Sequence, residues 1–291
     1  MKAEIFSPSA SLGRYIDSYM LVDIDWRKAS DVSKVWRLIP YGKASMLFLW
    51  GDQHEYSLDG TTSVMQRTRQ AFMVGQLTQP IWLKFTGHTR LIKIQFKSSG
   101  MHKFLPVNME EFKNVPSLDL EAVWGMAVHE LLEQLHESVS DAERIQKLNL
   151  FLEKRLLKQS DAIDYVDYTI SQMLACKGSL SIKGLEHALG ISTRQLERLF
   201  RTKIGISPKE MSKIIRLNSA FSSLETEPDI SLTSLSYQAG YYDQAHFSRE
   251  FKGIAGVSPN KLLSESSKEL FVTHGQCFVK QKPAAVLEYS T

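Results

Sequence analysis

Arginine and glutamine side chains gather on two short segments of this chain, each interleaved with apolar residues at helical spacing. The first segment is TRQLERLFRTK at 193–203 and the second is QAHFSREFK at 244–252. Arginine can donate two hydrogen bonds to one guanine edge, and glutamine can pair in a similar bidentate way with adenine. The lysines nearby carry the positive charge that suits phosphate groups. These residue types favour the recognition of a nucleic acid over the making or breaking of covalent bonds.

The two segments belong to one unit that the chain uses twice. RQLERLFRTKIGISP at 194–208 is followed 51 positions later by AHFSREFKGIAGVSP at 245–259, with arginine, phenylalanine, glycine, serine and proline at matching places. Such self-similarity is typical of a duplicated supersecondary structure. In each copy a short apolar stripe leads through a glycine turn to a second stripe. Two short helices joined in this way form a helix-turn-helix, which we therefore predict twice.

Capping residues mark where these helices begin. In the first unit Ser181 and Ser192 stand before the two apolar stripes, with Gly190 in the turn. Serine and aspartate side chains accept hydrogen bonds from the free N–H groups at the start of a helix. The second unit fills the same places with Ser231, Asp243 and Gly240.

A single helix is predicted between the two units. It runs from Pro208 to Leu224, starts with the capping box Ser207–Glu210, and extends about 25 Å at 1.5 Å per residue. Major-groove faces on one side of B-DNA recur about every 34 Å. A rigid helix of this length therefore suits two recognition helices that enter consecutive grooves.

The polar faces of the two recognition helices hold the candidate contact residues. The first face has Thr193, Arg194, Gln195, Glu197, Arg198, Arg201 and Lys203, and the second has Gln244, His246, Ser248, Arg249 and Lys252. The cations suited to phosphates are Arg201, Lys203, Lys209 and Lys252. Glu197 is either an acceptor for a cytosine amino group or a partner that orients Arg194 or Arg201. One such face equally fits a solvated helix, but two at matched positions indicate binding.

The bulk composition is that of a globular chain outside the membrane. Of 291 residues, 43% are hydrophobic and 23% are charged, and no apolar run is long enough to span a bilayer. The N-terminal MKAEIFSPSASLGRY lacks the apolar core of a secretory signal. A net charge of +3 permits a nucleic-acid partner without requiring one.

The first third of the chain reads as strands. Residues 81–85 and 92–96 alternate apolar and polar, and 44–50 is a more buried apolar run. Before them, Leu12, Ile16 and Tyr19 have the spacing of a helix.

From about residue 120 the period becomes helical. We predict one helix over 122–139 and, after a capping box at Ser140, a second over 142–158. Polar residues at 158–161 mark a domain seam, with Ser160 or Asp161 as the cap of the next helix. The expected domains are 1–160, 161–264 and a tail at 265–291, in which FVTHGQCFVK could form a hairpin.

Residues 180–263 resemble the DNA-binding domain of the AraC/XylS transcription regulators. The matching motifs are LGIS-TRQLERLF-RTKIGISP, the linker pattern Arg216, Ala220, Leu224, and AGYYDQAHFSREFKGIAGVSP. The chain departs from the family at Glu186 and Ser236, where a small alanine is usual, and at Leu262-Leu263, where an aromatic residue and arginine are common. Ala245 stands at an often polar position. These departures bear on how much sequence the second unit reads.

The resemblance implies a cytoplasmic regulator that binds double-stranded promoter DNA, often as an activator in contact with RNA polymerase. Its base-reading positions correspond to Arg194, Gln195, Glu197 and Arg198 in the first unit and to Gln244, Ala245, Ser248 and Arg249 in the second. Nothing in the sequence distinguishes activation from repression or names the operator.

The N-terminal region resembles, more weakly, the sensor domains of such regulators. The matching stretches are Arg37-Leu38-Ile39-Pro40-x-Gly42, 75–81, and Phe96 to Gly100. The implied fold class is α+β, with a cupin-like β-barrel and trailing helices before an all-α domain. Such domains bind a small-molecule effector or form homodimers. All five tryptophans fall here and either line an effector pocket or fill a core, and the helices at 121–136 and 142–158 either dimerise or pack on their own barrel.

Two other classes of protein compete with this interpretation. A metal-dependent cupin-type enzyme would need clustered ligands, but His54 and His88 stand apart, and HELLEQLH at 129–136 is not His-Glu-x-x-His. We therefore predict no enzyme activity, no metal and no cofactor. A DNA-binding architectural factor that needs no effector is the second alternative, with the first domain serving assembly alone.

Overall fold

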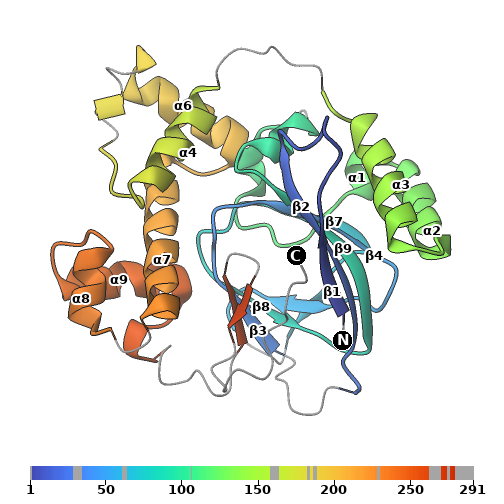
Figure 1. Cartoon of the computed structure of the whole chain (residues 1–291), viewed down its shortest axis with the longest axis horizontal. Helices are drawn as coiled ribbons and strands as arrows, with labels where there is room; N and C mark the ends of the chain where they lie inside the picture. The colour runs from blue at the N-terminus through green and yellow to red at the C-terminus, as the bar shows by residue number, and fades with distance from the viewer. Residues whose placement is uncertain are drawn as a thin grey trace.

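The protein is α+β, with a strand-rich N-terminal region followed by a helical C-terminal region (Figure 1). The computed structural model describes residues 2–28, 35–60, 64–105, 107–157, 164–181, 184–185, 189–227, 230–261, 270–273 and 276–278. Across these ranges, none of the helices combines the length and the apolar character that crossing a membrane requires.

The first sheet has six strands in the order β1-β2-β9-β4-β7-β10, all paired antiparallel. They are β1 (Lys2–Phe6), β2 (Ile16–Asp25), β4 (Ser45–Leu49), β7 (Ala71–Val74), β9 (His88–Phe96) and β10 (Leu118–Asp119). The helix predicted around Leu12, Ile16 and Tyr19 is wrong, because Ile16 and Tyr19 lie in β2. A register shift between Ile16 and Ser18 interrupts the two-residue period, so both side chains are buried three positions apart.

The second sheet also has six strands, in the order β12-β11-β3-β8-β5-β6. They are β3 (Val35–Leu38), β5 (Glu55–Ser57), β6 (Gln66–Arg67), β8 (Ile81–Lys84), β11 (Leu270–Thr273) and β12 (Gln276–Phe278). The hairpin predicted in the tail is present as β11–β12, and β11 pairs parallel to β3. Within the ranges given above, no strand pairing joins the two sheets, so the expected closed barrel is not confirmed.

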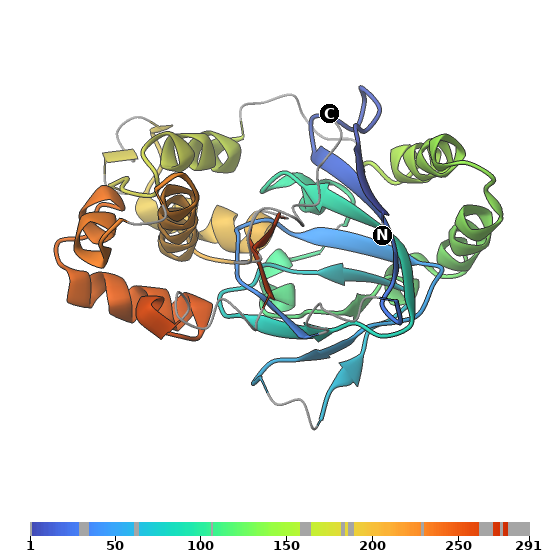
Figure 2. The ribbon, with the colours of Figure 1, turned by 60° about the horizontal axis from the view of Figure 1, so that its bottom comes forward.

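Three helices cover the outer face of the first sheet, away from the C-terminal helices (Figure 2). They are α1 (Glu121–Trp124), α2 (Ala127–Glu137) and α3 (Asp141–Glu153). The single helix predicted over 122–139 is broken at Gly125, whose φ of 60° ends α1. Leu131, Leu135, Leu148 and Leu152 bury the inner faces of α2 and α3 in one core with the sheet. Two short 3-10 helices, η1 (Gly100–Lys103) and η2 (Met109–Phe112), follow β9.

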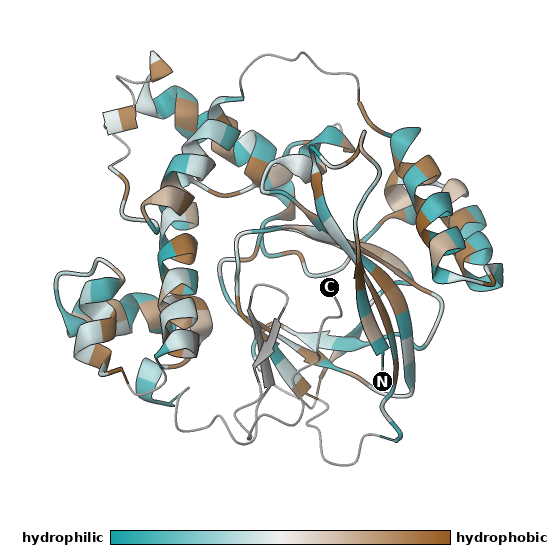
Figure 3. Cartoon of the chain, in the orientation of Figure 1, coloured by the Kyte–Doolittle hydropathy of each residue, from teal (hydrophilic) through white to brown (hydrophobic). Residues whose placement is uncertain are grey.

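The C-terminal region is built around one long helix. The helices are α4 (Tyr165–Ala175), α6 (Thr193–Ile204), α7 (Pro208–Thr226), α8 (Leu232–Gln238) and α9 (Gln244–Ala255). In Figure 1, α6 lies at one end of α7 and the α8–α9 pair at the other. Polar and apolar residues alternate along these helices, as amphipathic packing requires (Figure 3).

Two sequence predictions concern residues that the structure does not describe. Residues 182–183 and 186–188, within the helix expected after Ser181, lie outside the described ranges. So do the proposed caps Ser160 and Asp161. The described cap of α4 is Asp164, whose side chain accepts a hydrogen bond from the Val166 N–H at 3.0 Å.

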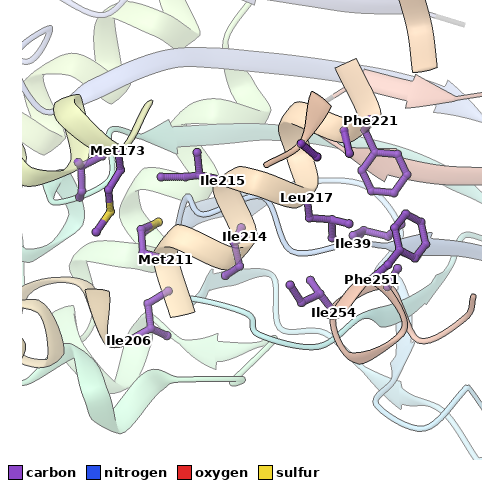
Figure 4. Close-up of a cluster of buried hydrophobic side chains, with 14 of the residues drawn as sticks. Ile39, Met173, Ile206, Met211, Ile214, Ile215, Leu217, Phe221, Phe251 and Ile254 are labelled. Atoms are coloured by element: carbon purple, nitrogen blue, oxygen red, sulfur yellow. The ribbon is translucent and has the colours of Figure 1, made fainter. Parts of the chain in front are cut away.

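One residue of the N-terminal region belongs to the C-terminal core. Ile39, directly after β3, is 0% exposed and clusters with buried residues of α7 and α9. Figure 4 shows it beside Leu217, Phe251 and Ile254. Full burial of an isoleucine side chain stabilises by roughly 1.5–3 kcal/mol. The two regions are therefore joined by apolar packing as well as by chain connectivity.

Candidate nucleic-acid interface

The first recognition helix, α6, is held by its apolar side and presents its polar side outward. The Ser192 hydroxyl accepts a hydrogen bond from the Gln195 N–H at 3.2 Å, as the predicted cap requires. Leu196, Phe200 and Ile204 are buried in the core. The four predicted base-reading residues of this helix are all exposed: Arg194, Gln195, Glu197 and Arg198.

The second recognition helix, α9, repeats this construction. The Asp243 carboxylate caps it by accepting from the His246 N–H at 2.7 Å, while Phe247 and Phe251 are buried. Of its predicted base-reading residues, Gln244, Ala245 and Arg249 are exposed and Ser248 is half-buried.

A hydrogen bond from α8 orients one side chain of this face. The Thr233 hydroxyl donates to Oε1 of Gln244 at 3.0 Å. The amide NH2 of Gln244 is thereby left as the donor toward an incoming partner. Sequence reasoning missed this contact, because no local pattern connects the first and second helices of the unit at that position.

The four predicted phosphate cations divide into two pairs. Lys209 and Lys252 are exposed. Arg201 pairs with Glu110 of η2, and Lys203 pairs with Asp164 at 2.7 Å. The ion pair of Arg201 thus reaches the N-terminal region, whereas the sequence pointed to Glu197 on the same helix as one possible partner.

A polar network between α7 and α9 was also missed by sequence reasoning. Tyr241 donates to the Glu250 carboxylate at 2.6 Å, and the Arg216 guanidinium lies over the Tyr241 ring at 4.8 Å. Burial, together with the neighbouring Glu250 carboxylate, raises the pKa of Tyr241 well above its usual range. The phenol therefore stays protonated, and it connects Arg216 of the linking helix to Glu250 of the second recognition helix. Arg216 is the part of this network that the sequence had marked, as a member of the linker pattern.

The N-terminal region touches the C-terminal end of each recognition helix at the same place in the repeat. α6 ends at Gly205 and α9 ends at Gly256, with φ of 94° and 79°. A Cβ on Gly205 would lie 2.5 Å from the Met109 carbonyl oxygen, and one on Gly256 would lie 2.9 Å from Cγ of Pro80. Both glycines are required by close approach as well as by backbone conformation.

A cavity of about 160 Å³ lies between the two sheets of the N-terminal region. Two of the five tryptophans, Trp26 and Trp36, line it together with Phe85. Trp50 instead lies under Arg144 of α3, and Trp124 lies under Arg155, which follows α3. In each pair the guanidinium carbon is 5.4 Å from the centre of the ring. Trp26 and Trp36 therefore line a cavity, whereas Trp50 and Trp124 pack against arginine side chains.

Two of the candidate metal-ligating histidines, His88 and His129, lie beside carboxylates instead. His129 lies 2.9 Å from the Glu121 carboxylate, and His88 lies 2.6 Å from that of Asp23. Among the residues with described positions, no three His, Cys, Asp or Glu side chains are grouped to hold a metal ion.

Models of two known families match two separate parts of the chain. The model of a helix-turn-helix domain family matches residues 185–265, and that of a domain of unknown function, DUF6597, matches residues 4–116. The HTH-type transcriptional regulator GlxA of Rhizobium meliloti is 35% identical over 77 residues, covering 26% of this chain and 24% of GlxA. The Msm operon regulatory protein of Streptococcus mutans is 31% identical over 87 residues, covering 30% of this chain and 31% of its own length.

The chain thus spans about a quarter to a third of the length of these curated relatives. Among solved structures, ToxT from Vibrio cholerae aligns over 84% of this chain and 97% of its own, with 13% identity and a TM-score of 0.43. The doubled unit and the matched domain define a helix-turn-helix protein. The matched stretch, residues 185–265, coincides with the part of the sequence that resembles the DNA-binding domain of the AraC/XylS regulators.

Proposed function

We propose that this protein is a sequence-specific DNA-binding transcription regulator. The proposal rests on one observation: α6 and α9 each expose a similar polar face, and the two helices lie at opposite ends of α7. The 19 residues of α7 extend about 28 Å. This length supports the insertion of two recognition helices into consecutive major grooves about 34 Å apart.

The roles of individual residues follow from their chemistry. We assign base reading to Arg194, Gln195, Glu197 and Arg198 in α6 and to Gln244, Ala245, Ser248 and Arg249 in α9. Lys209 and Lys252 are free to contact phosphates, whereas Arg201 and Lys203 must first exchange their carboxylate partners for phosphate oxygens. The second unit carries shorter side chains and is assigned the smaller share of sequence reading.

The N-terminal region is proposed to control the DNA-binding region, with the boundary near residue 160. Its support is the buried Ile39 and the contacts at Gly205 and Gly256, through which movement in one region reaches the other. A small-molecule effector would occupy the cavity between the sheets, and α2 and α3 would provide a homodimer contact. We further propose activation through RNA polymerase, in the cytoplasm, where promoter DNA lies.

Selection of genomic fragments by the purified protein tests the proposal. We expect a motif of about 20 base pairs with two blocks one helical turn apart. Arg198→Ala should relax the preference within one block, whereas Lys252→Ala should weaken binding to all sequences alike and reduce its salt dependence. Fragments without a shared motif, or an unchanged preference for Arg198→Ala, would rule out the assigned recognition face.

A further inference from the structure

We infer that the cavity between the two sheets binds a small, uncharged, ring-sized molecule that carries a hydroxyl group, and that this molecule sets the separation of the two recognition helices. The cavity of about 160 Å³ has mostly apolar walls, contributed by strands of both sheets. An engineered apolar cavity of about 150 Å³ stays dry and binds benzene. Its size therefore corresponds to a single six-membered ring with one small substituent.

His54 supplies the polar group that selects the substituent. It lines the cavity, is 3% exposed, and its ring lies 4.7 Å from that of Phe85. Among the described residues, its Nδ1 has no hydrogen-bond partner. A water molecule in this place would need two to four polar partners, and the rings of Trp26, Trp36 and Phe85 provide few.

The charge state of His54 favours a neutral ligand. Burial lowers the pKa of His54 to about 4, so the imidazole is uncharged at neutral pH. A neutral imidazole offers one N–H donor and one lone-pair acceptor, and a hydroxyl group can complement either. A carboxylate would enter a mostly apolar space, which is costly unless a cation pairs with it. The two lysines that line the cavity already have partners: Lys43 pairs with Asp17, and the Lys93 ammonium lies 5.1 Å from the centre of the Tyr41 ring.

The supports of the two recognition helices come from opposite sides of this cavity. On the first-sheet side, the Phe112 carbonyl packs over Gly75 after β7, and η2 in turn contacts the end of α6 at Gly205. On the second-sheet side, Pro80 precedes β8 and contacts the end of α9 at Gly256, while Ile39 follows β3.

The cavity wall is continuous with the residues that support the second unit, Ile39 and Pro80. Leu38 and Ile81 are paired partners at the ends of β3 and β8, and both line the cavity. Their immediate neighbours are Ile39 and Pro80, which hold the second unit. A ligand that spreads the two sheets therefore changes the separation of α6 and α9, provided that it binds one separation more tightly than another.

Calorimetric titration of the full chain with phenol, benzene and benzoate tests the ligand class, and it does not depend on DNA binding. We expect phenol to bind about two- to tenfold more tightly than benzene, because one net hydrogen bond contributes about that factor to the affinity. Benzoate should bind more weakly than either. His54→Phe should reduce the affinity for phenol to that for benzene. His129→Phe, on the surface of α2, should leave both affinities unchanged.

The wild-type chain gives a second measurement that does not require the variant to fold. Phenol should shift the imidazole nitrogen resonances of one histidine, and benzene should shift them much less. Tighter binding of benzoate than of phenol would overturn the ligand class, because it would place the polar group at Lys43 and Lys93 on the cavity wall. Absence of binding by all three probes would overturn the site.

The second half of the inference rests on the proposed function and is tested with DNA. The selected site is compared with versions in which the distance between its two blocks is changed by one base pair in either direction. We expect phenol to change the ratio of these affinities severalfold in the wild type and not in His54→Phe. An unchanged ratio with phenol bound would overturn the coupling alone, whereas absence of DNA binding in every condition would overturn the proposed function and leave the ligand result standing.

Discussion

The recognition helices of the two units, α6 and α9, are capped and buried in the same way, but the N-terminal region holds the two units differently. The first is held by polar contacts: Glu110 pairs with Arg201, and Lys113 pairs with Glu210 at 2.6 Å. The second is held by apolar contacts through Ile39 and Pro80. Ion pairs between half-exposed groups are weak and are screened by salt, and phosphate oxygens can replace their carboxylates. Apolar packing is not screened by salt and does not exchange with phosphate. The comparison indicates that DNA and salt act first on the support of the first unit.

Matched truncations in the two units should have the largest effects. Phe200→Ala and Phe251→Ala remove buried rings at equivalent positions, and each should lower the free energy of unfolding by about 3–5 kcal/mol. Phe251→Ala should cost more, because Ile39 also loses a neighbour in the shared cluster. Denaturant titration measures both values. Equal losses would show that the apolar contact between the regions adds nothing.

The paired glycines test the backbone contacts at the helix ends. Gly205→Ala and Gly256→Ala each place a side chain in the left-handed region, at a cost of about 1–3 kcal/mol. Gly205→Ala should be the worse, because the new Cβ meets a backbone carbonyl, whereas the Pro80 ring at Gly256 can shift. Thermal unfolding of the two variants gives the order, and the reverse order would contradict the closer support of the first unit.

The hydrogen bond from Thr233 to Gln244 is particular to the second unit. Thr233→Val should release the Gln244 amide and weaken discrimination at the base pairs read by α9, by about 0.5–1.5 kcal/mol. Binding to sites with single base changes measures this loss block by block. Thr226→Val, at the end of α7, serves as the control. A loss confined to the block read by α6 would reverse the assignment of the two units.

The smallest effect is expected at the ion pair of the first unit. Glu110→Gln should free Arg201 for phosphate and raise DNA affinity by about 0.2–1 kcal/mol at low salt, with the gain shrinking as salt is added. Glu111→Gln removes the same charge from the adjacent exposed residue and should have less effect. Fluorescence anisotropy with labelled DNA is sufficient. Equal gains in both variants would mean that only net charge matters.

Local features of this fold were predictable from sequence because their causes are local. Ser192, Ser207 and Asp243 cap helices where their side chains can reach nearby N–H groups, and the structure confirms all three. The strands at 81–85 and 92–96 follow from alternation for the same reason.

The errors and omissions have non-local causes. The shift at Ile16 depends on the pairing of β2 with β9, a strand that begins more than sixty residues after β2 ends. Glu110 and Ile39 look like ordinary loop residues until the folded chain brings them to α6 and α9. The exposed faces of the recognition helices were predictable, but the partners of Arg201 and Lys203 were not, since ion pairing is set by tertiary contact.

The parallel pairing of β11 with β3 bears on the order in which the chain matures. A ribosome releases β3 early and β11 only after the whole DNA-binding region has emerged, so the edge of β3 waits without its neighbour throughout most of synthesis. An unpaired strand edge is a site for wrong association. β11 and β12 therefore complete the sheet that supports the second unit only after the DNA-binding region has been synthesised.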